Sequence, residues 1–376
     1  MCIICSNSNN ESLRKATKIN VCVNVSFLPE NLPFLENISI IGNRKIKRIP
    51  FYPKLRKLCC IKSNISEIPE YLQSLSCLII NKSSVRFIPI LKNLKILHIR
   101  NSYVKTLPTL ENLEILDCSE SELCDISNLP NLKFLDCKKS EIKEIPPLNL
   151  RKLNCSDTKL IELPDMPTLI ELFINNTDIE TLPNFSNLHI LEAQNCKLRE
   201  LPPLPNLIEL NVSGCRDLKT LNSLSLHCLN LSFTSVKEIE CPNLQVLKME
   251  RGVLEKIDNL RNLLYLEIWY NSTITEIVNN SIEEVILNFT NVKKVRGINI
   301  TNLQCANCRM LTEVPISDEP FFVENCPWLN AEEQRMNNLV FLQRKIKKYL
   351  QKRKKTVYLV LNRFLPYELS DLISVY

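Results

Sequence analysis

An apolar residue recurs along this chain every 18 to 20 residues, and this spacing limits the possible folds more than any other feature. A unit this short cannot bury its own apolar face, so it must pack against the next unit. The period therefore predicts one elongated solenoid, although 376 residues would otherwise suggest two or three domains. Fifteen residues, called the anchors below, share the register: Ile38, Leu58, Leu78, Leu97, Leu116, Leu135, Leu153, Leu172, Leu191, Leu210, Leu229, Leu247, Leu266, Val285 and Leu303.

Other positions repeat in step with the anchors. A second apolar residue follows two positions later, as at Ile99 and Cys118, and this alternation predicts a short strand with one buried face. Many units end in proline, as in residues 142–146 and 179–183, which favours an extended backbone. Five positions after the anchor stands a small polar or thiol side chain that can satisfy backbone groups in a buried turn: Asn43, Ser63, Ser83, Ser102, Ser121, Ser140, Thr158, Thr177, Cys196, Cys215, Thr234, Asn271, Thr290 and Cys308.

This pattern resembles the leucine-rich repeat, L-x-x-L-x-L-x-x-N-x-L-x-x-L-P, and the segments LENLEILDCSESELCDIS and LPNLKFLDCKKSEIKEIP carry the match. The resemblance implies a right-handed solenoid with parallel β-strands on the concave face. Units of about 19 residues leave no room for a convex helix, so an extended or polyproline-like convex face is implied. Short units that end in proline are similar to the repeats of secreted bacterial effectors. The chain departs from the family in using Ser, Thr or Cys where Asn is usual.

We expect four segments. Residues 1–34 form an N-terminal cap, 35–315 the solenoid of about 15 repeats, 316–330 a C-terminal cap, and 331–376 a basic, short α-helical tail. The tail holds ten Lys or Arg against four Asp or Glu, a net charge of +6. The whole chain is also +6, so residues 1–330 sum to zero. Because binding to nucleic acid needs clustered positive charge, we expect that the neutral body, residues 1–330, does not bind it.

The scarce residues argue against an enzyme. Four glycines, all far apart, form no phosphate-binding loop, and three histidines leave little for acid–base chemistry or metal binding, so we expect no cofactor.

No run of about 18 apolar residues exists to cross a membrane. The 17 cysteines, without a secretion signal, predict reduced thiols and a cytoplasmic protein. Two C-x-x-C pairs, Cys2 with Cys5 and Cys305 with Cys308, fall at opposite ends of the solenoid and cannot share an ion.

One pair of acids needs separate mention. Asp117 and Asp136 hold the same outward position on adjacent predicted strands, which would place them about 5 Å apart. A carboxylate pair at that distance suits glycoside hydrolysis. The face is open, however, and Lys138 and Lys139 lie close by, so we expect a charged and solvated surface rather than a catalytic pair.

The C-terminal repeats gather aromatic and arginine side chains at outward positions on or just after the predicted strands. Such clusters are the usual anchors of protein interfaces, which makes this a candidate partner-binding surface. A local packing cluster under the tail is the alternative. The residues are Phe233, Arg251, Tyr265, Trp269, Tyr270 and Phe289.

The tail begins with an amphipathic pattern. Asn330 and Glu333 form a capping box, and an apolar stripe follows on a strongly basic helix. Residues 342–352, LQRKIKKYLQK, resemble an IQ motif, which implies calmodulin as a partner. The matching residues are Leu342, Gln343, Ile346, Lys347 and Lys352. A capping helix laid across the last repeat and binding to an anionic membrane remain alternatives.

The last residues, RFLPYELSDLISVY, resemble the opening of an F-box. The matching positions are Leu365, Pro366, Glu368, Leu369, Leu372 and Ile373. A truncated F-box after a repeat array looks like the repeat proteins of large DNA viruses and implies a cullin-type ubiquitin-ligase adaptor as a partner. We therefore expect a non-enzymatic protein–protein interaction module, in the host cytoplasm if viral, that acts as a substrate receptor. The alternatives are a calmodulin- or membrane-responsive regulator and a plain C-terminal helix.

Overall fold

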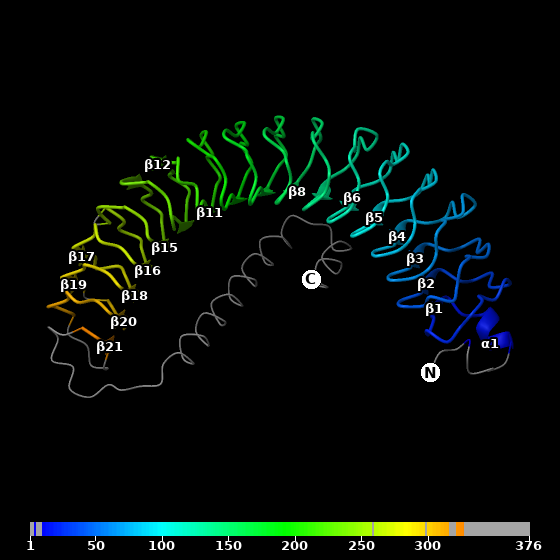
Figure 1. The fold of residues 1–376 in the computed structure, drawn as a ribbon, viewed down its shortest axis with the longest axis horizontal. Coiled ribbons are helices and arrows are strands. Elements are labelled where there is room, and N and C mark those ends of the chain that lie inside the picture. The colour runs from blue at the N-terminus through cyan, green and yellow to red at the C-terminus, as the bar shows by residue number, and fades with distance from the viewer. Residues whose placement is uncertain (1–3, 5–9, 258, 298, 316–320, 327–376) are drawn as a thin grey trace.

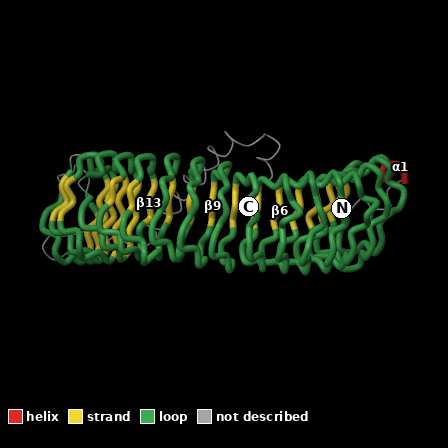
Figure 2. Tube along the Cα trace, turned by 90° about the horizontal axis from the view of Figure 1, so that it is seen from above, coloured by secondary structure: helices red, strands yellow, loops and turns green. Residues whose placement is uncertain are grey.

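The computed structural model describes residues 4, 10–257, 259–297, 299–315 and 321–326. They form one curved solenoid whose strands line the inner side of an arc (Figure 1) and stack as parallel rungs (Figure 2). Seventeen strands make a single parallel sheet. They are β1 (Lys18–Asn20), β2 (Asn37–Ser39), β3 (Lys57–Cys59), β4 (Cys77–Ile79), β5 (Ile96–His98), β6 (Ile115–Asp117), β7 (Phe134–Asp136), β8 (Lys152–Asn154), β9 (Glu171–Phe173), β10 (Ile190–Glu192), β11 (Glu209–Asn211), β13 (Cys228–Asn230), β15 (Val246–Glu250), β16 (Tyr265–Trp269), β18 (Glu284–Asn288), β20 (Asn302–Ala306) and β21 (Phe322–Glu324).

The predicted leucine-rich-repeat fold is confirmed. Each anchor lies in a strand and faces the anchors of the neighbouring repeats, as Leu116 faces Leu97 and Leu135. All fifteen anchors are buried. The convex side carries no helix among the described residues, where α1 (Asn10–Arg14) at the N-terminal end is the one helix. Two short strand pairs, β12 (Leu221–Asn222) with β14 (Ile239–Glu240) and β17 (Glu276–Val278) with β19 (Lys294–Arg296), lie outside the main sheet.

The sheet extends beyond residues 35–315 at both ends. β1 pairs with β2 through Ile19 and Ile38, and β21 pairs with β20 through Val323 and Cys305. The segments expected to act as caps thus contribute strands of their own. The division of the chain into four segments stays a prediction, and the tail, 331–376, lies outside the described residues.

The small side chains five residues after the anchors, called the small polar column below, are all buried. They form hydrogen bonds of two kinds. Hydroxyls donate to a carbonyl of their own repeat, as Ser121 Oγ does to Cys118 O at 2.6 Å and Thr177 Oγ1 to Ile174 O at 2.8 Å. Asparagine instead reaches back one repeat, because Asn43 Nδ2 donates to Cys22 O and Asn271 Nδ2 to Gly252 O, both at 2.8 Å. Ser or Thr in place of Asn therefore removes a bond between repeats. It keeps a bond within the repeat at positions such as Ser121 and Thr177, whereas the buried hydroxyls of Ser102 and Ser140 have no hydrogen-bond partner among the described residues.

A second set of asparagines, four residues before the anchors, restores those bonds between repeats. Each side-chain amide donates to a backbone carbonyl 19 or 20 residues earlier, at 2.7–2.9 Å. We call this set the asparagine ladder: Asn93, Asn112, Asn131, Asn187, Asn206, Asn243 and Asn262. This ladder precedes the strands and was not predicted, because the polar column recognised in the sequence follows them.

We predict that Asn131→Ala lowers the free energy of unfolding by about 1 kcal/mol, since it removes the 2.7 Å bond to Glu111 O. Asn128→Ala is the matched control, because the Asn128 side chain is exposed and has no hydrogen-bond partner in the described part of the chain. Thermal melts followed by circular dichroism compare the two. Equal melting temperatures would show that the ladder does not couple the repeats.

Candidate concave binding surface

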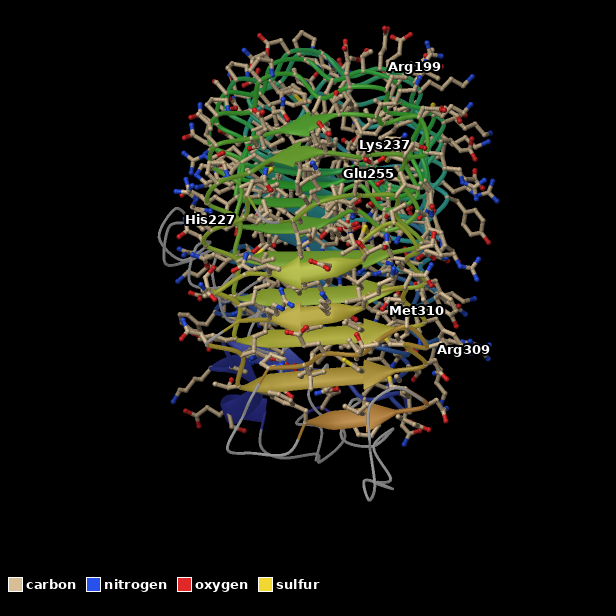
Figure 3. All side chains as sticks on the ribbon, turned by 90° about the vertical axis from the view of Figure 1, so that its left-hand side faces the viewer. Arg199, His227, Lys237, Glu255, Arg309 and Met310 are labelled. Atoms are coloured by element: carbon tan, nitrogen blue, oxygen red, sulfur yellow. The ribbon has the colours of Figure 1, made fainter. Side chains whose placement is uncertain are left out.

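The inner face of the sheet is broader in the C-terminal repeats. Strands β1 to β13 of the main sheet have three residues each, whereas β15, β16, β18 and β20 have five. Figure 3 shows these long strands stacked as rungs. On β16 the burial alternates, so that Leu266 and Ile268 enter the core while Tyr265, Glu267 and Trp269 remain on the open face. Five-residue strands thus present three outward side chains, which widens the surface on which a partner could lie.

The structure divides the six predicted residues into two groups. Tyr265 and Trp269 are half-buried on the open face of β16. The other four occupy one column, four residues after the anchors, at the flank of the arc where each strand ends. We call them the aromatic ladder: Phe233, Arg251, Tyr270 and Phe289.

The aromatic ladder is a continuous stack across four consecutive repeats. The rings of Tyr270 and Phe289 lie parallel, with centroids 4.8 Å apart and planes 6° from parallel. The guanidinium carbon of Arg251 lies 5.2 Å from the centroid of Tyr270 and 5.9 Å from that of Phe233. Arg251 is therefore sandwiched between two rings, in contacts that contribute about 0.5–1 kcal/mol each at exposed sites.

The backbone at these four residues is strained. Their φ angles are 51–56°, in the left-handed region, where a bulky side chain costs about 1–2 kcal/mol. The same conformation recurs in this column in most other repeats. It occurs at residues that tolerate it, such as Asn176 and Gly214, and also at the bulky side chains of Lys62, Lys82, Glu120 and Lys139. Exposure remains 37–46% for the three rings, so burial does not repay the strain. The left-handed turn therefore belongs to the repeat, and what sets these four residues apart is that three exposed rings and one guanidinium stack on one another.

A polar group sits beside the aromatic ladder. Tyr265 donates its hydroxyl to Glu267 Oε2 at 3.0 Å, and Lys248 Nζ lies 3.0 Å from the same oxygen. The indole Nε1 of Trp269 is buried and has no acceptor among the described residues. An unpaired buried donor is costly, and an acceptor on a partner would relieve that cost.

Asp117 and Asp136 are register partners on β6 and β7, as predicted from their spacing. Asp117 Oδ1 accepts the Ser119 N–H at 3.0 Å and the Ser119 hydroxyl at 2.6 Å. Asp136 Oδ1 accepts the Lys138 N–H at 3.1 Å. Asn154, Asn211 and Asn230 accept the equivalent N–H in their own repeats. Both carboxylates therefore perform a turn-forming role that amides perform elsewhere, which accounts for the pair without catalysis.

We predict that Asp136→Asn stabilises the fold at neutral pH. Burial, and then the charge of Asp117, raise the pKa of Asp136 in the folded state. Stability is therefore lost as pH rises from the unfolded-state pKa through the folded-state pKa, and the loss is complete at pH 7. The amide keeps the hydrogen bond and should raise the melting temperature by about 1–3 °C at pH 7. At about pH 3 the gain should vanish, because the carboxyl is then protonated in both states.

The cysteines mostly pack in the core. Burial raises the pKa of Cys118 and Cys137 well above the ordinary range, which keeps these thiols protonated. Cys308 lies in the small polar column, with Sγ 3.2 Å from Thr290 Oγ1. Within the described residues no three His, Cys, Asp or Glu side chains are arranged to hold a metal ion. Cys2 and Cys5 lie outside those residues.

Both predicted tail motifs lie outside the described residues, so the structure does not place them. They are the IQ-like set, Leu342, Gln343, Ile346, Lys347 and Lys352, and the F-box-like set, Leu365, Pro366, Glu368, Leu369, Leu372 and Ile373. In the part of the chain that is described, no helix is long and apolar enough to span a membrane.

Several solved structures of leucine-rich-repeat proteins are similar to this one. YopM from Yersinia pestis, a leucine-rich effector, superposes with a TM-score of 0.62 at 24% identity, over 83% of this chain and 89% of that chain. YopM from Yersinia enterocolitica gives 0.60 at 24%, over 82% and 80%. Toll in its complex with Spätzle from Drosophila gives 0.51 at 16%, over 81% and 51%. These likenesses establish the fold. No family model and no curated protein matches the sequence.

Proposed function

We propose that this chain is a non-enzymatic protein-interaction module that holds a partner against the C-terminal half of its concave face. The aromatic ladder, at the edge of that face, carries the proposal, because three exposed rings and Arg251 stack into one continuous surface. Trp, Tyr and Arg are the residues on which interface energy most often concentrates. Here all three types lie within two neighbouring repeats, at Arg251, Trp269 and Tyr270.

The fold supports binding by pre-organisation. The open face is a sheet whose backbone is already fixed by its neighbours, and stacking restricts the rotamers of the aromatic ladder. A partner that binds there need not pay to order this surface. Toll, part of which is similar in fold to this chain, is known in a complex with Spätzle. That precedent supports the general role and does not identify the partner of this chain.

The finer proposal is a substrate receptor. The F-box-like residues 365–373 would recruit a cullin-type ubiquitin-ligase adaptor in the host cytoplasm, while the concave face holds the protein to be modified. The resemblance to repeat proteins of large DNA viruses supports this arrangement. The receptor works by bringing two proteins together and performs no chemistry itself. The alternative, a calmodulin- or membrane-responsive regulator, rests on the basic residues of the IQ-like segment, such as Lys347 and Lys352.

Affinity purification from eukaryotic lysate tests both parts. We predict that the triple variant Trp269→Ala, Tyr270→Ala, Phe289→Ala recovers at least tenfold less of the concave-face partner than the unchanged protein. The reason is that the variant removes the stacked surface. The matched control is Phe87→Ala, Ile161→Ala, which removes convex-side residues that are 77% and 67% exposed. Equal losses in both variants would contradict binding by the concave face.

A chain ending at residue 358 tests the tail separately. The receptor proposal predicts that this truncation loses a cullin adaptor and keeps the concave-face partner. Calcium-dependent recovery of calmodulin, with no cullin adaptor recovered from either chain, would instead favour the calmodulin-responsive regulator. Identical recoveries from the full and truncated chains would show that the F-box resemblance has no role in binding.

A further inference from the structure

The zero net charge of the body conceals a strong separation of charge along the arc. Residues 1–104 hold 16 Lys or Arg and 5 Asp or Glu, a net of +11, whereas residues 105–330 hold 21 and 32, a net of −11. The extreme is residues 37–66, which contain eight cations and no acid. The sum over residues 1–330 is zero and hides this arrangement.

The open face of the sheet shows the same separation. On β1 to β5 the outward residues include Lys18 and Lys57 and no Asp or Glu. On β9 to β18 the outward carboxylates outnumber the single lysine, Lys248, by six to one. Those six are Glu171, Glu192, Glu209, Glu250, Glu267 and Glu284. The surface therefore changes sign between its two ends.

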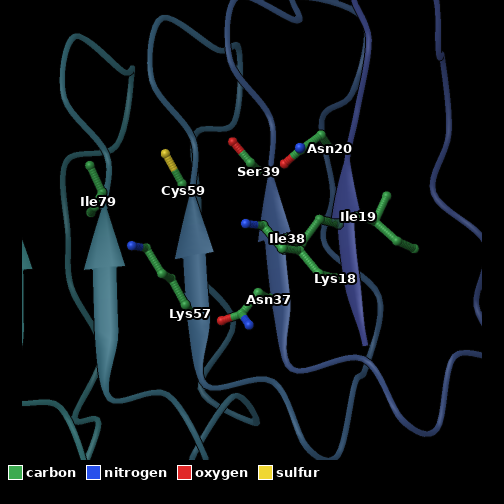
Figure 4. Close-up of a pocket in the computed structure, with 9 residues that line it drawn as sticks. All are labelled: Lys18, Ile19, Asn20, Asn37, Ile38, Ser39, Lys57, Cys59 and Ile79. Atoms are coloured by element: carbon green, nitrogen blue, oxygen red, sulfur yellow. The ribbon is translucent and has the colours of Figure 1, made fainter. Parts of the chain in front are cut away.

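A hollow lies on the basic end of this face, over β1 to β4 (Figure 4). Lys18 and Lys57 line it together with the side-chain amides of Asn20 and Asn37 and the hydroxyl of Ser39. Neither lysine forms an ion pair with any described residue. Two ammonium groups, two amides and a hydroxyl therefore line the same hollow. Together they supply the positive charge and the hydrogen-bond donors that bind an oxyanion.

We infer that this hollow binds the carboxylates of an acidic, Asp- or Glu-rich segment of the protein partner. The inference rests on the proposed function, because the partner lies along the same concave face. A nucleic acid is a uniform polyanion and would meet the carboxylates from β9 onward if it followed the face. A protein segment that is acidic only where it crosses β1 to β4 avoids that repulsion. The charge reversal therefore also sets the direction in which the partner lies, with its acidic part at the N-terminal end.

Fluorescence anisotropy with labelled decaglutamate and the full-length protein tests the inference directly. We expect binding that weakens as salt rises, and that falls about tenfold in Lys18→Glu, Lys57→Glu. The matched control is Lys47→Glu, Arg48→Glu, which makes the same change in net charge. Both residues are exposed and lie between β2 and β3 in the chain, about half a repeat from either strand. The control should retain most of the affinity. Tail lysines are held constant because all three proteins contain residues 331–376.

Two results would overturn the inference. Equal weakening in both variants would mean that decaglutamate responds to overall charge and not to the hollow. Tighter binding of a ten-nucleotide single-stranded RNA than of decaglutamate, lost in the Lys18 and Lys57 variant, would assign the hollow to phosphate. Neither result depends on capturing the partner, so the proposed function is tested independently by the Trp269, Tyr270 and Phe289 variant.

Discussion

The structure depends on one constraint: each repeat can complete its hydrogen bonds and bury its apolar residues only against its neighbours. The anchors form a column of buried side chains, and the strands that carry them pair in parallel from β1 to β21. With about 19 residues per turn, no helix separates the outer edges of the repeats in the part of the chain that the structure describes. Because every repeat pairs its strand and packs its anchor in the same way, the arc is a regular support on which outward residues can vary.

Sequence predicted this support well because its causes are periodic. Residues such as Leu116 and Ser121 recur at a fixed offset, and their burial follows from the offset alone. The asparagine ladder was equally periodic, yet its role depends on a contact with the preceding repeat that only three-dimensional stacking reveals. Strands β1 and β21 were not predicted because residues 1–34 and 316–330 were assigned to caps, although Ile19 continues the anchor column beside Ile38 and Val323 pairs with Cys305.

The candidate surface was predictable only in part. The six residues were found from their chemistry and their outward positions. Their division into a strand-borne pair and a stack at the flank depends on side-chain and backbone geometry, including the left-handed φ of Tyr270 and the placement of Arg251 between two rings. The charge separation was readable from the sequence, but only when charges are summed by repeat instead of over the whole body.

The inner side of the arc has two distinct ends, an aromatic and acidic one over β13 to β18 and a basic one over β1 to β4. We propose that partners bind on this inner side. Photo-crosslinking in cell lysate tests this claim directly. One variant carries p-benzoylphenylalanine in place of Trp269, and a second variant carries it in place of Phe87. We predict a discrete crosslinked protein from position 269 and none from position 87. Crosslinking of the same protein only through position 87 would place the binding surface on the convex side and contradict the account.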